Sequence, residues 1–179
     1  MKTQDVDLNN LELTDEQELE EFVPPDDGTY TVILKLQDGK KVQMGNGKRG
    51  AFFLIPVQAN IMEPGSKFDK RVLFHSAFAG SQAQIIKAAG DKPSKFPSER
   101  AKQTLAILQS EPIVKVTTRW RAQYKDIDAE GKVVYKEIFA GQRMFPELVD
   151  EPGVRQYIVE TPFGEEVSAQ AEILKFAKV

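Results

Sequence analysis

Hydrophobic and polar residues alternate along the chain from residue 29 onward, with the period of two that is typical of a half-buried β-strand. The first such segment carries its apolar set at Tyr30, Val32, Leu34 and Leu36. Comparable apolar runs predict four further strands, at residues 51–61, 71–79, 113–124 and 132–140.

The middle of the chain changes to helical spacing. Ile85, Ile86 and Ala89 fall on one side of a helix predicted over residues 82–89, which stops at Gly90. A second predicted helix begins at Ser98 and carries its apolar positions three or four residues apart. Near the end of the chain, residues 155–159 predict a short strand. Residues 167–176 form an amphipathic segment that fits either a helix or a strand.

This order of elements predicts a mainly β protein with a minor α component. Three strands, a helical connection and two longer strands match the layout of a five-stranded, partly open oligonucleotide-binding (OB) barrel, and other small β-rich folds also satisfy it. We expect an acidic N-terminal arm at residues 1–27, an OB-like barrel domain at residues 28–146 and a C-terminal extension at residues 147–179 that packs on the barrel.

Charge is distributed unevenly, although the 179 residues carry a net charge of only −3. Residues 1–27 hold ten acidic side chains and one basic side chain, so the rest of the chain has a net charge of +6. An acidic arm on a basic body is typical of proteins that bind nucleic acid or another polyanion, but a solubilising tail would give the same asymmetry. The chain has no cysteine, which excludes disulfides and thiolate catalysis.

The strongest local signal is the segment at residues 113–125. In a strand, its odd-numbered positions share one face and its even-numbered positions share the other. The even face is mostly apolar and includes Trp120. The odd face carries four cationic residues and no acidic one: Lys115, Arg119, Arg121 and Lys125. Every second strand residue lies ~6.6–7 Å further along, which roughly matches the phosphate spacing of an extended single strand. We therefore predict a nucleic-acid-binding row, with a solvated outer sheet face as the alternative.

A second basic cluster lies in the glycine-rich segment at residues 38–50, which we expect to be a flexible loop. Its cationic residues are Lys40, Lys41, Lys48 and Arg49. Glycine lets backbone N–H groups approach a phosphate, although a solvent-exposed hairpin tip often has the same composition. Lys132, Lys136 and Arg143 extend the basic region along the next predicted strand.

Aromatic residues could add base stacking to these charges. Tyr124 and Tyr135 are the preferred candidates, because a ring with a polar tip tolerates partial exposure. Trp120 and Phe139 are further candidates, but Trp120 falls on the apolar face and is expected in the core. We also assign four phenylalanines to the core: Phe52, Phe53, Phe74 and Phe78.

Enzymatic chemistry finds little support in the sequence. His75 is the only histidine, and neither a catalytic Ser–His–acid order nor a metal-ligand spacing surrounds it. The glycine-rich segment lacks the spacing of a phosphate-binding nucleotide loop. We therefore predict a protein that is not an enzyme and needs neither cofactor nor metal.

The chain resembles phage-encoded single-stranded DNA-binding proteins of the OB-barrel type over roughly residues 23–146. The resemblance rests on residues 25–32, Phe53-Leu54, Val72-Leu73-Phe74, the helix at residues 84–90 and the strand that contains Trp120. It implies binding to single strands with little sequence preference, during replication or recombination. Many such proteins carry a C-terminal acidic tail that recruits partners, whereas here the acidic residues are N-terminal.

From these observations we expect a cytoplasmic single-stranded DNA-binding protein, located in the host cell if the protein is viral. No apolar stretch reaches the ~18 residues of a membrane span, and the acidic N-terminus predicts no signal peptide. The arm could recruit replication or recombination proteins or compete with DNA, and the chain could form homo-oligomers. The main alternative is a phage structural or assembly protein whose N-terminal arm docks on a neighbouring subunit. An inhibitor or adaptor of host proteins is a third interpretation.

Overall fold

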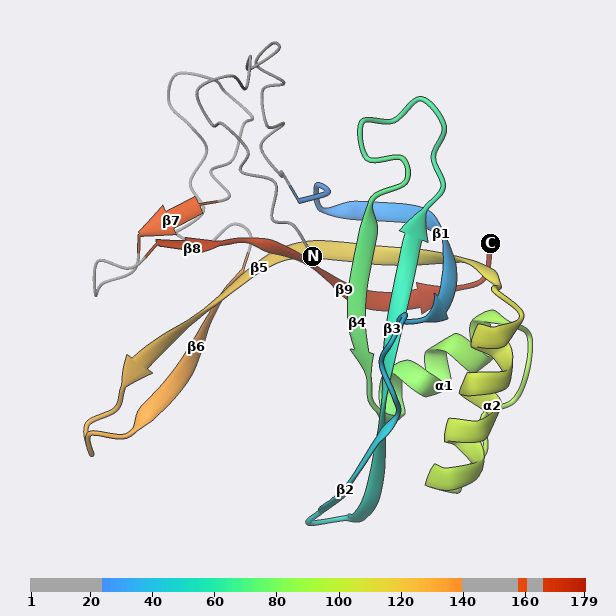
Figure 1. Cartoon of the computed structure of the whole chain (residues 1–179), viewed down its shortest axis with the longest axis horizontal. Helices are drawn as coiled ribbons and strands as arrows, with labels where there is room; N and C mark the ends of the chain where they lie inside the picture. Colours follow the sequence, from blue (N-terminus) through green and yellow to red (C-terminus); the bar gives the residue numbers. More distant parts are fainter. Residues whose placement is uncertain (1–23, 140–157, 161–165) are drawn as a thin grey trace, which may run out of the picture.

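The computed structural model describes residues 24–139, 158–160 and 166–179. Within these ranges the fold is mainly β, as the alternation predicts, with two helices (Figure 1). The elements are β1 (Gly28–Leu36), β2 (Gln43–Gly47), β3 (Gly50–Ile61), β4 (Val72–Ala77), α1 (Ala79–Ala88), α2 (Pro97–Gln109), β5 (Ile113–Ile127), β6 (Val133–Phe139), β7 (Ile158–Glu160), β8 (Glu166–Ser168) and β9 (Gln170–Ala177). Most of the acidic arm expected at residues 1–27 lies outside the described residues.

The strands form an antiparallel sheet that has seven strands in the described part of the chain. Its main path runs β2-β3-β1-β5-β6, with β4 also paired to β3 and β9 also paired to β5. The two longest strands change partners along their length. β3 pairs with β2 through its first half and with β1 and β4 through its second half. β5 begins beside β1, runs beside β9 and ends beside β6, so the β5–β6 hairpin projects away from the body (Figure 1).

The expectation of a five-stranded barrel needs correction, because the sheet has two more strands and stays open. Over residues 24–139, 158–160 and 166–179, no strand ladder joins β4 to β9. The two strands meet through side chains instead, where the His75 ring packs edge-on against Phe176 with centroids 5.3 Å apart. The amphipathic segment at residues 167–176 is a strand rather than a helix over most of its length. As β9, it pairs with β5 in the main sheet.

The hydrophobic core lies between this curved sheet and the two helices. β1 contributes Tyr30, Val32 and Leu34, which are the alternate positions that the sequence pattern predicts. The corresponding inward positions of β3 are also apolar, and Ile55 and Val57 are fully buried. Burial of such side chains contributes roughly 1.5–3 kcal/mol each, which makes this alternation the main determinant of the fold.

The two helices connect β4 to β5, as the sequence pattern predicts. α1 ends just before Gly90, whose φ of +93° is the left-handed conformation that glycine adopts most easily. α2 begins at Pro97, because proline lacks the N–H that the first helical turn leaves unpaired. Among the described helices, neither is long and apolar enough to cross a membrane.

The segment at residues 38–50 is more ordered than the predicted loop, because it contains strand β2. β2 and the first half of β3 form a hairpin that turns at Lys48 and Arg49. The sequence pattern does not reveal this hairpin, because glycines such as Gly45 are also typical of a loop. A Cβ atom at Gly45 would lie 2.4 Å from the Phe52 ring, so glycine is required for that ring to lie across β2.

The core assignment of Phe52, Phe74 and Phe78 is wrong. These side chains are 39%, 58% and 50% exposed, respectively. In β4 the alternation is as expected, but the other set of positions faces the core, with Leu73 buried at 4% exposure. Phe53 is the only one of the four phenylalanines assigned to the core that packs against it.

Candidate nucleic-acid interface

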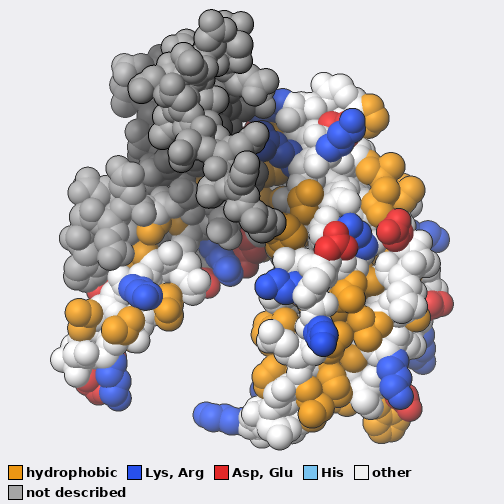
Figure 2. Space-filling view, in the orientation of Figure 1, with side chains coloured by type: hydrophobic (Ala, Val, Ile, Leu, Met, Phe, Trp, Pro, Cys, Tyr) orange, Lys and Arg blue, Asp and Glu red, His pale blue; other side chains and the backbone are white. Residues whose placement is uncertain are grey.

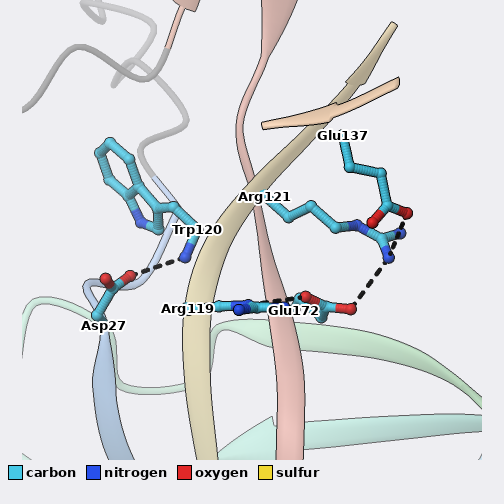
Figure 3. A network of polar contacts seen from close by, with 6 residues as sticks. All are labelled: Asp27, Arg119, Trp120, Arg121, Glu137 and Glu172. Atoms are coloured by element: carbon cyan, nitrogen blue, oxygen red, sulfur yellow. Dashed lines mark hydrogen bonds and ion pairs between the residues drawn. The ribbon is translucent and has the colours of Figure 1, made fainter. Parts of the chain in front are cut away.

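β5 confirms the predicted separation into two faces. Its even-numbered residues from Val114 to Ala122 are buried, and its odd-numbered residues are half-buried or exposed. Trp120 is 1% exposed, and its indole Nε1 donates a hydrogen bond to the Pro25 carbonyl at 2.8 Å. Its backbone N–H donates to the Asp27 carboxylate at 2.7 Å (Figure 3). Trp120 therefore belongs to the core and holds the opposite face of β5 in place.

The cationic row on β5 has an acidic neighbour that the sequence pattern did not reveal. Glu172 of β9 lies directly opposite Arg119, at 3.2 Å from its Nε. The other oxygen of the same carboxylate lies 3.0 Å from Nη1 of Arg121, so one carboxylate contacts both arginines (Figure 3). Glu137 of β6 approaches the same guanidinium nitrogen at 3.5 Å. Two of the four predicted cations are therefore partly neutralised by residues from other strands.

The two outer members of the row are exposed lysines. Lys115 and Lys125 form no ion pair with the residues that the structure describes. Lys115 lies in the part of β5 that pairs with β1, whereas Lys125 lies on the projecting hairpin. The row therefore runs from the body of the sheet onto the hairpin, with its central pair charge-balanced and its ends cationic.

If this row binds a nucleic acid, Glu172→Gln should strengthen that binding. The substitution removes the carboxylate that contacts both Arg119 and Arg121, so more positive charge faces the ligand. We expect the slope of log affinity against log salt to become steeper by about 0.7 for each additional phosphate contact. Fluorescence anisotropy with a labelled oligodeoxythymidylate, repeated at several salt concentrations, measures both quantities.

Glu130→Gln is the matched control for this prediction. Glu130 pairs with Lys132 at 3.2 Å in the turn of the β5–β6 hairpin, and both side chains are 74% exposed. The substitution Glu130→Gln changes the net charge by the same amount as Glu172→Gln, but it removes no contact of Arg119 or Arg121. Equal effects of the two substitutions would show that only net charge matters. If Glu172→Gln weakened binding and Glu130→Gln did not, Arg119 and Arg121 would not belong to the interface.

The remaining candidates on the β5–β6 hairpin lie on two different faces. Tyr135 is opposite Lys125 and shares its face, with 61% of the tyrosine exposed. Tyr124 is opposite Lys136, on the other face of the hairpin. Lys136 forms an ion pair with Asp126, and this hydrogen bond lowers the pKa of Asp126 and raises that of Lys136. Tyr124 and Lys136 therefore do not extend the cationic row.

The other basic candidates are exposed but do not form a single cluster. Lys40 and Lys41 precede β2, whereas Lys48 and Arg49 follow it at the tip of the hairpin. Six residues separate the two pairs, and the five of them in β2 alone span roughly 17 Å at the usual strand rise. Arg143, and the side chain of Phe139, lie outside the described residues.

The structure brings together three aromatic side chains that we call the phenylalanine platform: Phe52, Phe74 and Phe78. The rings of Phe52 and Phe78 lie with centroids 6.0 Å apart. Phe74 and Phe78 both line a cavity of about 440 Å³, which we call the seam pocket because it opens between β4 and β9. The charged and titratable side chains among its described lining residues are His75, Arg121 and Glu172, and further polar lining comes from glutamine and serine residues. The phenylalanine platform therefore adjoins the central part of the cationic row.

The space-filling view shows how this region is presented to solvent. A broad hollow separates the β5–β6 hairpin from the body of the molecule, and hydrophobic side chains gather on the body beside that hollow (Figure 2). Lysine and arginine side chains appear on both sides of it.

The alternation of residues along β4 predicts a strand with two faces. It does not predict which of these faces the helices and β9 cover.

His75 lies at the base of the seam pocket and contacts the Ser81 hydroxyl through Nε2 at 2.8 Å. Burial lowers the pKa of His75 below its ordinary value of 6.5. The negative charge of Glu172 opposes this shift, and the positive charge of Arg121 adds to it. The folded protein therefore holds His75 neutral over a range where the unfolded chain would bind a proton.

We expect the free energy of unfolding to decrease as the pH is lowered from about 7 to about 5.5. The folded-state pKa is the lower one, so the unfolded state binds more protons in this window and is stabilised by acid. Urea unfolding at several pH values measures the effect. His75→Gln keeps a group that can hydrogen bond to Ser81 and should flatten the dependence, since the chain has no second histidine. The same pH dependence in both proteins would contradict this assignment.

The described residues contain no cluster of three His, Cys, Asp or Glu side chains that could hold a metal. The region combines exposed aromatic rings, cationic side chains and a partly polar pocket. Comparison of the chain with protein-family models, with curated proteins and with solved structures found no match.

Proposed function

We propose that the chain is a non-enzymatic protein that binds single-stranded DNA without sequence preference. The observation that supports this proposal best is the phenylalanine platform, whose three rings are 39–58% exposed. Phe52 and Phe78 lie with centroids 6.0 Å apart, and Phe74 and Phe78 line the same pocket as Arg121. Exposed phenylalanine is unfavourable in water unless a ligand or partner covers it. Stacked bases are a suitable cover, because every base has an aromatic face.

The charges around the phenylalanine platform support a polyanionic ligand. Arg121 lies at one side of the platform, in the seam pocket. Lys48 and Arg49 lie at the other side, at the tip of the β2–β3 hairpin beside Phe52. Glu172 is the one acidic residue among the described residues that line the seam pocket. A strand that crosses the platform would therefore meet cations at both ends, and their contacts with phosphate would make binding depend on salt.

The arrangement of the strands is compatible with the proposed function. In chain order β1, β3 and β4 precede the two helices, and β5 and β9 follow them. In this proposal these five strands correspond to those of a partly open OB barrel, a fold that binds oligonucleotides on one face and with its loops. In this proposal β2 and β6 are extensions that lengthen two barrel strands into hairpins. A role in phage DNA replication or recombination is the biological setting that we propose for it.

Binding of a labelled oligodeoxythymidylate, measured by fluorescence anisotropy, tests the proposal. We expect saturable binding at low salt, weaker binding to duplex DNA of the same length, and a steep loss of affinity as salt increases. An RNA oligonucleotide in the same assay establishes the preference between DNA and RNA. If none of these probes binds at low salt, the proposed function is refuted.

A structural or assembly role is the second candidate, and the β5–β6 hairpin favours it. Ile127, Val133 and Tyr135 are 60–63% exposed on one face of this projecting hairpin. A partner subunit could cover these side chains. Analytical ultracentrifugation without nucleic acid distinguishes the two functions, because an assembly protein should form large species and a DNA-binding protein should not require them.

A further inference from the structure

A second cavity lies on the other side of the phenylalanine platform from the seam pocket. It has a volume of about 450 Å³ and opens between the β2–β3 hairpin and the first turns of α1 and α2, and we call it the hairpin pocket. Phe52 lines it and also contacts Phe78, so the platform connects the two cavities. Small-molecule sites usually have volumes of ~300–1,000 Å³, so the hairpin pocket is large enough for a nucleotide.

The charge of the hairpin pocket has one sign. Lys48, Arg49 and Arg100 line it, and none of its described lining residues is acidic. The remaining lining is largely apolar and comes mainly from Ala51, Phe52, Phe53, Ala79 and Pro97. An anionic group attached to a flat apolar group matches both parts of this lining.

Arg100 is the residue that distinguishes this cavity from an ordinary basic surface. Its Nη1 donates to the Ser94 carbonyl at 3.2 Å, which holds the side chain against the loop before α2. Its Nε is buried and has no hydrogen-bond partner among the residues that the structure describes. That atom is closed to solvent, so an anion in the cavity would contact the other N–H groups of this half-buried guanidinium, which the bond to Ser94 holds at the cavity wall.

The hairpin pocket is held in shape by a buried side chain. Gln82 of α1 is 1% exposed, and its Nε2 donates to the carbonyls of Phe53 at 2.7 Å and Ala77 at 2.9 Å. These bonds join β3, the end of β4 and α1 around the pocket. The pocket is therefore formed by fixed elements, whereas Lys48 and Arg49 at the hairpin tip are exposed.

We propose that the hairpin pocket binds one nucleotide, with its phosphate on Arg100 and its base against Phe52. Lys48 and Arg49 supply further positive charge to the same phosphate. The inference deepens the proposed function and rests on it for the claim that the nucleotide belongs to a bound strand. The pocket itself would accept the same phosphate from a free nucleoside monophosphate.

Isothermal titration calorimetry with deoxyadenosine monophosphate, deoxyadenosine and inorganic phosphate tests the pocket directly. We expect saturable binding of the nucleotide and binding of both other probes that is about tenfold weaker or more. Deoxyadenosine lacks the hydrogen bonds to charged groups, and inorganic phosphate lacks the base that stacks on Phe52. Arg100→Gln should weaken nucleotide binding by about tenfold or more, because it also removes hydrogen bonds to a charged group. Lys102→Gln, which removes an exposed charge from the same helix outside the pocket, should leave binding unchanged.

The outcomes separate the pocket from the proposed function. Nucleotide binding that Arg100→Gln weakens, without any oligonucleotide binding, would support the pocket and refute the strand-binding function. Oligonucleotide binding together with equal nucleotide affinities of Arg100→Gln and Lys102→Gln would refute the pocket alone. Urea unfolding of both variants checks that each is folded. A destabilised Arg100→Gln is replaced by Arg100→Lys, which keeps the charge but lacks the planar set of guanidinium N–H donors and should also bind the nucleotide more weakly.

Discussion

The double substitution Phe74→Ala, Phe78→Ala should weaken binding to single-stranded DNA by more than any single change of charge. A base stacked on an aromatic side chain contributes ~1–3 kcal/mol, which corresponds to about 5- to 150-fold in affinity for each ring. Both rings line the seam pocket, and Phe78 also contacts Phe52, so the double variant removes most of the phenylalanine platform. Fluorescence anisotropy at one low salt concentration measures the change.

Phe96→Ala is the matched control for the double variant. Phe96 is 66% exposed and lines neither the seam pocket nor the hairpin pocket. Its removal should leave the affinity for DNA within about twofold, because the ring lies outside both pockets. The protein should also stay folded, since a surface substitution usually changes stability by less than ~0.5 kcal/mol. Equal losses in the control and in the double variant would mean that exposed phenylalanines act non-specifically. No loss in either would remove stacking from the proposal.

The salt dependence of the double variant separates stacking from charge. Loss of the rings leaves the number of phosphate contacts unchanged, so the slope of log affinity against log salt should remain that of the original protein. Glu172→Gln, by contrast, should change that slope. The two substitutions therefore report different contributions from adjoining parts of the same surface.

The sequence was sufficient to predict the strands whose two faces differ most. In β5, apolar and polar residues alternate over a long segment, and the predicted buried face is the buried face of the structure. In β4 both alternate sets contain apolar residues, so the pattern predicts a strand but not its orientation. Leu73 is buried and Phe74 is exposed because of what packs on each side of the sheet. That information comes from the tertiary fold, which the local pattern does not contain.

The candidate site was only partly predictable for the same reason. The arginines of β5 are local features of the sequence, but Glu172 reaches them from β9, 53 residues away along the chain. Arg100 was not identified, because it stands in a helix whose pattern indicates only an ordinary amphipathic surface. The signal that could have identified it is its place in the first turn of α2, where the side chain can reach the preceding loop.

Glu172 also bears on the choice between the two candidate functions. A row of four unpaired cations would favour nucleic acid through charge alone, but the central pair is partly balanced. The proposed function therefore depends more on the phenylalanine platform than on the cationic row. In that proposal, phosphate contacts at Lys48 and Arg49 should contribute more to the salt dependence than a contact at Arg119.

Trp120→Ala should destabilise the fold by about 3–5 kcal/mol, the range for removing a large aromatic side chain from a core. The indole is 1% exposed, and the Pro25 carbonyl would lose its hydrogen bond from Nε1. A domain of ordinary stability has only ~5–15 kcal/mol in total, so the variant should be partly unfolded at moderate urea concentrations. Because Trp120 is the only tryptophan, far-UV circular dichroism must replace fluorescence as the probe.

Two further variants divide this effect into its causes. Trp120→Phe keeps most of the apolar volume but cannot donate to Pro25, so its cost should lie near the ~1–3 kcal/mol of one unsatisfied buried group. Tyr135→Ala removes an aromatic ring that is 61% exposed and should cost less than ~0.5 kcal/mol. If Trp120→Ala were as mild as Tyr135→Ala, Trp120 would not be the anchor of β5. The positions of Arg119 and Arg121 on the opposite face would then need another explanation.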